Sequence, residues 1–171
     1  DAHALASQGV ILQMFAHGIA AAGLFYLVGR LESRTGTCGL NDFGGLSAVT
    51  PGLAAAFYIL VFCSLGLPFL AGFAAEFLIF SGSFAVAPGV TAAATLGLLA
   101  TAVFMLTMLQ RIFTGAPSKP CQAMRDLTFN EALVVIPIIF FVLWAGVAPG
   151  HWLIWSDNLG LTLQLTQGAT P

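Results

Sequence analysis

Residues 52–86 read GLAAAFYILVFCSLGLPFLAGFAAEFLIFSGSFAV, and Glu76 is the one charged side chain in this stretch. A continuous α-helix over about 35 residues, at ~1.5 Å per residue, would be ~50 Å long, whereas a bilayer core is ~30 Å thick. Gly66-Leu67-Pro68 is the obvious point of interruption, because proline lacks a backbone donor and glycine weakens a helix. The stretch therefore predicts a broken membrane helix, with Glu76 about two turns beyond the break.

Composition places the whole chain in the membrane class. Of its 171 residues, 58% are hydrophobic and 7% are charged, and the mean hydropathy is +0.95; a soluble domain carries about 25% charged residues. With five Lys and Arg against seven Asp and Glu, the chain has no basic surface for a phosphate backbone, so nucleic acid is not an expected partner. Cys38, Cys63 and Cys121 have neither a zinc spacing nor a disulfide framework, and we expect reduced thiols and no metal.

Runs of about 20 apolar residues predict an all-α membrane protein with about four transmembrane helices, the second of them discontinuous. The candidate helices cover residues 9–29, 52–86, 90–113 and 131–149. Residues 1–150 then form the transmembrane region, and residues 151–171 form an interfacial segment and a polar tail. The chain begins at Asp1 without a signal-peptide pattern, as if it were cut or processed upstream. Thr128 and Glu131 have the spacing of a helix-starting capping box.

The basic residues fall in two places that lie on one side of a four-span topology: Arg30, Arg34, Arg111, Lys119 and Arg125. By the positive-inside rule that side is cytoplasmic and both termini are outside. We expect Arg111 to act as a snorkelling anchor at a helix end. Three residues are expected at the outer boundary of the membrane, where amphipathic aromatic side chains collect: His151, Trp152 and Trp155.

Two titratable side chains, His17 and Glu76, fall well inside the predicted spans. An ionised carboxylate in an apolar medium is costly, so Glu76 must be neutral, paired with a distant segment, or in contact with water. One hypothesis is a proton relay through both residues. The alternative is a packing histidine and a neutral carboxylic acid with one interhelical hydrogen bond. Small residues around His17 favour close packing against neighbouring helices.

The sequence contains no phosphate-binding loop, no nucleophilic triad and no cluster of metal ligands, so we expect no cofactor bound by this chain. Any part in catalysis would be through protons. Four segments of the chain occur in the same order as in a known protein family: QMFAHG at 13–18, FGGL at 43–46, GLP with AEF at 66–77, and QRIFTG at 110–115. Together they resemble the C-terminal part of the antiporter-like subunit M family of bacterial respiratory complex I, the counterpart of mitochondrial chain 4.

The resemblance implies an antiporter-like inverted-repeat fold in which the four spans correspond to the last four of fourteen membrane helices. It implies that His17 is the histidine of a central hydrophilic axis and that Glu76 is a carboxylate near the exit of the proton channel. Sister subunits L and N usually carry lysine at the position of Glu76. The family usually has glycine where this chain has Phe69 and Ala75, and its upstream glutamate and lysines are absent from this chain.

The implied function is proton translocation by a membrane subunit of an NADH:quinone oxidoreductase, coupled to electron transfer in other subunits. NADH, FMN, iron–sulfur clusters and quinone would belong to the wider complex. The implied partners are other antiporter-like membrane subunits, lipid, water and protons, in the bacterial cytoplasmic (inner) membrane. Two alternatives remain open: a subunit of a multisubunit cation/proton antiporter or membrane-bound hydrogenase, and a structural scaffold without transport activity.

Overall fold

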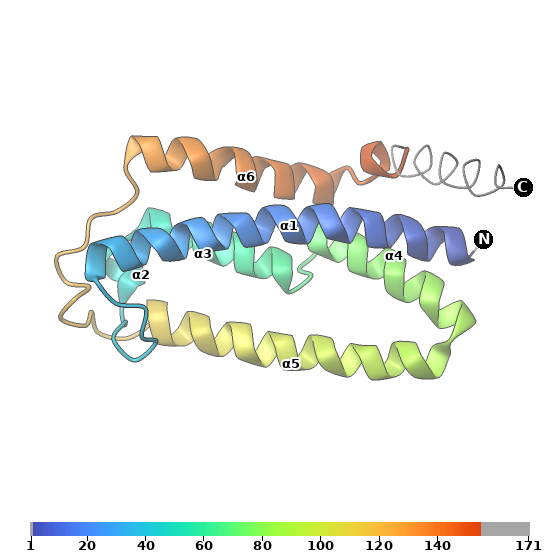
Figure 1. The fold of residues 1–171 in the computed structure, drawn as a ribbon, viewed down its shortest axis with the longest axis horizontal. Coiled ribbons are helices and arrows are strands. Elements are labelled where there is room, and N and C mark those ends of the chain that lie inside the picture. The colour runs from blue at the N-terminus through green and yellow to red at the C-terminus, as the bar shows by residue number, and fades with distance from the viewer. Residues whose placement is uncertain (1, 155–171) are drawn as a thin grey trace, which may run out of the picture.

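The computed structural model describes residues 2–154, and these form an all-helical protein (Figure 1). The helices in this part of the chain are α1 (Ala2–Thr35), α2 (Leu46–Val49), α3 (Pro51–Ser64), α4 (Ala71–Val86), α5 (Pro88–Phe113) and α6 (Phe129–Val147). The predicted all-α class is confirmed. Trp155 and the predicted polar tail lie outside the described residues.

Three of these helices, α1, α5 and α6, are long and apolar enough to cross a membrane. The α3 and α4 helices are apolar but have only 14 and 16 residues. A residue in a helix adds ~1.5 Å, so each would cover about 20–25 Å, less than a bilayer core of ~30 Å. The 52–86 stretch therefore consists of two short helices in place of one long one, with residues 65–70 between them.

The interruption between α3 and α4 follows from its residues. Pro68 has no N–H to donate to the carbonyl of Ser64, so the helical ladder stops there. Gly66 has a φ of 65° and Phe69 has a φ of 71°. The left-handed region suits glycine, but it costs a side-chain-bearing residue such as Phe69 about 1–2 kcal/mol. The backbone at Phe69 is thus strained, and this is a position where the family that the sequence resembles usually has glycine.

Small residues bring α1 and α4 into close antiparallel contact (Figure 1). A Cβ added at Gly9 would lie 2.7 Å from the backbone nitrogen of Ile79, and one at Gly82 would lie 2.5 Å from the carbonyl oxygen of Ala2. On α6, a Cβ at Gly146 would collide with the backbone of Leu70 in the break. Such close backbone approach is how small residues hold membrane helices together. The result is a tightly held frame of α1, α4 and α6 around the interruption.

The loop before α6 is tied to the start of α3 by Asp126. Its carboxylate accepts hydrogen bonds from the backbone N–H groups of Gly52 and Leu53, each at 2.8 Å, and from Leu127 at 2.8 Å. Burial acts to raise the pKa of Asp126, but these three donors and the nearby Arg34 outweigh it and hold the pKa below its ordinary value. Asp126 is therefore an ionised cap on an otherwise uncapped helix start.

Candidate functional site

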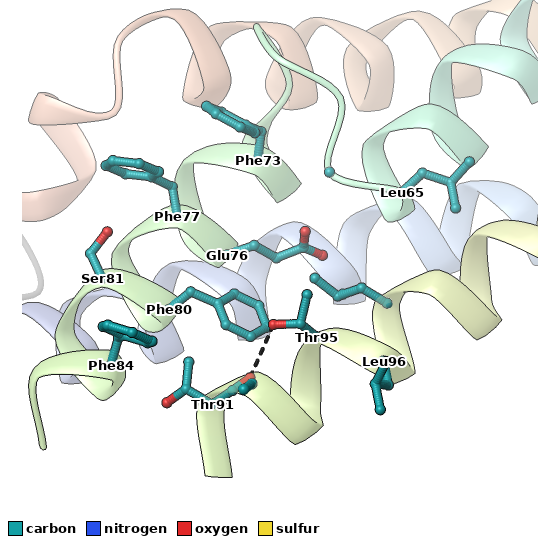
Figure 2. Close-up of a pocket in the computed structure, with 13 residues that line it drawn as sticks. Leu65, Phe73, Glu76, Phe77, Phe80, Ser81, Phe84, Thr91, Thr95 and Leu96 are labelled. Carbon is teal, nitrogen blue, oxygen red and sulfur yellow. Dashed lines mark hydrogen bonds between the residues drawn. The ribbon is translucent and has the colours of Figure 1, made fainter. Parts of the chain in front are cut away.

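Glu76 lies on α4 with its carboxylate directly over the interruption. A Cβ added at Gly66 would overlap this carboxylate, and Cδ of Glu76 is 3.1 Å from the position that such a Cβ would take. Figure 2 shows the side chain extending from α4 toward the end of α3, near Leu65 and Thr95. Gly66 thus supplies both the left-handed turn and the empty space that the carboxylate occupies.

The Glu76 side chain is half-buried and borders an open cavity of about 850 Å³ between the end of α3, α4 and α5. The walls are mainly aromatic, with Phe73, Phe77, Phe80 and Phe84 on α4. Hydroxyl groups come from Ser81, Thr91 and Thr95, and Thr95 Oγ1 donates to the carbonyl oxygen of Thr91 at 3.0 Å. Among the residues that the structure describes, none donates a hydrogen bond to Glu76 or forms an ion pair with it. The cavity is large enough for several water molecules.

His17 borders a different cavity, of about 310 Å³, between α1, α3 and α5. Its neighbours there include Phe57, Ser64 and Met105. Ala16 and Ala20 are buried, but His17 lies on the exposed side of α1 within this chain. The structure therefore does not bring His17 and Glu76 into one cavity, and the close packing expected around His17 holds for the neighbouring face of its helix.

A third polar residue near His17 was missed by sequence reasoning. Oε1 of Gln13 is buried and has no hydrogen-bond donor within residues 2–154. Gln13 precedes His17 by four residues, so the two side chains start from the same side of α1 one turn apart. A buried acceptor without a donor costs about 1–3 kcal/mol. Its place in the QMFAHG segment was the available signal.

Glu131 also forms ion pairs with residues far away in the sequence, which its local sequence did not predict. The predicted capping box is confirmed, since the backbone N–H of Thr128 donates to Glu131 Oε2 at 2.8 Å. In addition, Glu131 pairs with Nε of Arg30 at 2.5 Å and with an Nη of Arg34 at 2.5 Å. The Glu131 side chain is 5% exposed, against 41% for Arg30 and 14% for Arg34. This double ion pair joins the end of α1 to the start of α6.

In the described part of the chain, no group of three or more His, Cys, Asp or Glu side chains is arranged to hold a metal ion. The titratable side chains that border the two cavities are Glu76 and His17. The double ion pair lies at the opposite end of α1 from the α1–α4 glycine contacts, as the bounds of the helices and Figure 1 show. The role of this double ion pair in the fold is to fix α6 against α1.

Comparison with known proteins gives concordant results. Residues 2–105 match the family described as NADH:quinone oxidoreductase/Mrp antiporter, transmembrane. The chain is similar to the NADH-quinone oxidoreductase subunit M of Pseudomonas aeruginosa, with 38% identity over 145 residues, 85% of this chain and 28% of that protein. It is also similar to the subunit of the same name from Escherichia coli K12, with 34% identity over 147 residues, 85% of this chain and 29% of that protein.

The fold has a counterpart among solved structures. A chain of the structure titled "Respiratory complex I from Thermus thermophilus with bound NADH" matches with a TM-score of 0.78 and 34% identity, covering 87% of this chain and 32% of that one. The chain thus spans less than a third of the length of the relatives that it matches.

Proposed function

From the premise that this chain belongs to the NADH:quinone oxidoreductase/Mrp antiporter transmembrane family, we propose that it is the C-terminal part of a proton-translocating membrane subunit of an NADH:quinone oxidoreductase. The matching relatives are named as subunit M of that enzyme. In this assignment the chain takes part in an oxidoreductase by moving protons. NADH, FMN, iron–sulfur clusters and quinone belong to other subunits of the complex.

The observation that carries the proposal is the position of Glu76. The carboxylate lies over a helix break, next to an open cavity of about 850 Å³, with no cationic partner among the described residues. At membrane depth an unpaired carboxylate requires either a proton or contact with water. Each of these states allows proton exchange, and irregular backbone at this depth is typical of ion and substrate pathways. Glu76 is therefore the terminal proton carrier of this segment.

His17 is the intermediate relay in the same pathway. An imidazole exchanges protons near neutral pH, and His17 has an open cavity of about 310 Å³ in front of it. Among the described residues, none forms a hydrogen bond with the His17 side chain, so both ring nitrogens are available to water in this cavity. The two side chains border separate cavities, so a proton passing from His17 to Glu76 would have to be carried by water between them.

The proposal includes an orientation in the membrane. The end of α1, the end of α5 and the start of α6 lie at one end of the molecule (Figure 1). The basic residues are in these elements or in the loop between α5 and α6, so this end is the cytoplasmic one in the bacterial inner membrane. The exposed faces of α4 and α5 then face lipid or neighbouring antiporter-like subunits.

A second candidate function is cation/proton exchange in a multisubunit antiporter, which the description of the matching family includes. Copurifying subunits separate the two: dehydrogenase subunits support the first function and antiporter subunits support the second. Glu76 would carry protons in either case. A purely structural scaffold is the remaining alternative, and it predicts transport that is indifferent to both Glu76 and His17.

The test is Glu76→Gln in the complete subunit within the assembled complex, which keeps the size of the side chain and removes its ionisation. Glu32→Gln, at an exposed site near the end of α1, is the matched control. We expect Glu76→Gln to abolish NADH-driven acidification of inverted membrane vesicles, and Glu32→Gln to leave it intact. Native gels establish that each complex assembles. Full pumping by an assembled Glu76→Gln complex would overturn the proposal.

A further inference from the structure

Consecutive residues at the end of α3 line the cavities at His17 and at Glu76. Ser64, the last residue of that helix, lines the His17 cavity. Leu65 and Gly66, the next two residues, line the Glu76 cavity. The lining therefore changes from one cavity to the other between consecutive residues, whose Cα atoms are ~3.8 Å apart. We call the segment from Ser64 to Gly66, whose residues border one cavity or the other, the crossing.

Ser64 brings a hydroxyl group to this crossing. Its Oγ donates to the carbonyl oxygen of Leu60 at 3.1 Å. A serine hydroxyl has one donor and two acceptor positions. With the donor directed to Leu60, both acceptor positions of Ser64 Oγ remain available to a donor that enters the His17 cavity.

The backbone at the crossing adds two more polar atoms. The carbonyl of Ser64 would receive its helical hydrogen bond from residue 68, but that residue is proline and has no N–H. Within residues 2–154, no backbone N–H donates to the carbonyls of Ser64 and Leu65. Backbone groups in this state are tolerated at membrane depth where they line a hydrated space or are covered by protein. The crossing therefore has a hydroxyl and two free carbonyl oxygens within two residues.

We infer that Ser64 is a further relay residue, whose hydroxyl passes protons between the His17 cavity and the Glu76 cavity. This inference rests on the proposed function. In the transfer, the Ser64 hydroxyl turns from the Leu60 carbonyl toward a water molecule on the Glu76 side and releases its proton there, while Oγ accepts a proton from a protonated water molecule on the His17 side. The hydroxyl is unchanged after it rotates back, and the Glu76 carboxylate receives the proton. No electron moves and no bond to carbon changes.

The test compares two variants of equal shape, Ser64→Thr and Ser64→Val, in the complete subunit within the assembled complex. Threonine retains the hydroxyl and valine lacks it. The matched control compares the native Thr101 with Thr101→Val. The Thr101 hydroxyl also donates to the carbonyl oxygen four residues earlier, at 3.0 Å, but it lies on an exposed face of α5. Proton pumping per NADH oxidised and its solvent deuterium isotope effect are measured for each complex.

We expect Ser64→Val to slow pumping about tenfold, less than the ~10²–10⁴ of a positioned proton-transfer group, because water can replace part of the function. Ser64→Thr should restore the rate, and the isotope effect should rise in Ser64→Val alone. Equal rates for the Thr and Val variants, whether both normal or both slow, would overturn the inference. If Ser64→Val does not assemble, Ser64→Ala replaces it with the same expected loss.

Measuring the Glu76→Gln complex in parallel distinguishes a failure of the Ser64 inference from a failure of the proposed function. Loss of pumping in Glu76→Gln with normal pumping in Ser64→Val refutes the role of Ser64 and leaves the proposed function intact. Normal pumping in Glu76→Gln refutes the proposed function and the role of Ser64 together.

Discussion

Gly66→Ala tests whether the position of the Glu76 carboxylate, as distinct from its presence, is needed for transport. An added Cβ would overlap this carboxylate, with Cδ at 3.1 Å and Oε1 at 3.6 Å from the Cβ position. The group that must yield is the end of a flexible side chain, so the fold accommodates the change. To reach an ordinary contact of ~3.5 Å, the nearest carboxylate oxygen has to move by more than ~1 Å.

The substitution also has a backbone cost, since an alanine in the left-handed region loses about 1–2 kcal/mol. Gly36→Ala is the matched control, because Gly36 has a φ of 72° and open space around its Cβ position. Both variants carry the same backbone strain, but only Gly66→Ala displaces Glu76. Thermal unfolding of the two complexes should therefore shift to a similar extent.

Transport should separate the two variants. A displacement of about 1 Å at a reacting group can cost ~10²-fold in rate, so we expect Gly66→Ala to reduce proton pumping by one to two orders of magnitude and Gly36→Ala to leave it nearly unchanged. The assay is NADH-driven acidification of inverted vesicles, normalised to assembled complex. Equal pumping by the two variants would refute the reasoning that Gly66 is there to make room for the carboxylate.

Two further predictions concern stability. Glu131→Gln should destabilise the subunit by about 2–3 kcal/mol. This is less than the ~3–5 kcal/mol for breaking a fully buried ion pair, because Arg30 is 41% exposed. Thermal unfolding measures the loss, with Glu32→Gln as the control, and an unchanged unfolding midpoint would contradict the prediction. Asp126→Asn should cost about 1 kcal/mol as a lost charged cap. The folded state lowers the pKa of Asp126. The stability that this carboxylate contributes is therefore complete above the ordinary carboxyl range and disappears as the pH falls through the lowered pKa, and the Asn variant should lack this pH dependence. The prediction is refuted if the stabilities of the two proteins fall by the same amount as the pH is lowered.

The local features of this chain were readable from the sequence because they arise from neighbouring residues. The apolar runs predicted the membrane class and the helices, since each residue's transfer from water depends on its own side chain. The broken second span was predicted from Gly66 and Pro68, whose effects on the backbone act within one turn. The capping box of Thr128 and Glu131 was predicted for the same reason, because its two hydrogen bonds close within four residues.

The partners of the charged and titratable groups were decided by tertiary structure alone. Glu131 pairs with Arg30 across 101 residues and with Arg34 across 97, and neither pairing leaves a trace in local spacing. The sequence identified His17 and Glu76 as titratable residues inside predicted spans, but only the packing of the helices places them in separate cavities. Sequence determines which groups are costly in an apolar medium, whereas the arrangement of helices determines which partner or space offsets that cost.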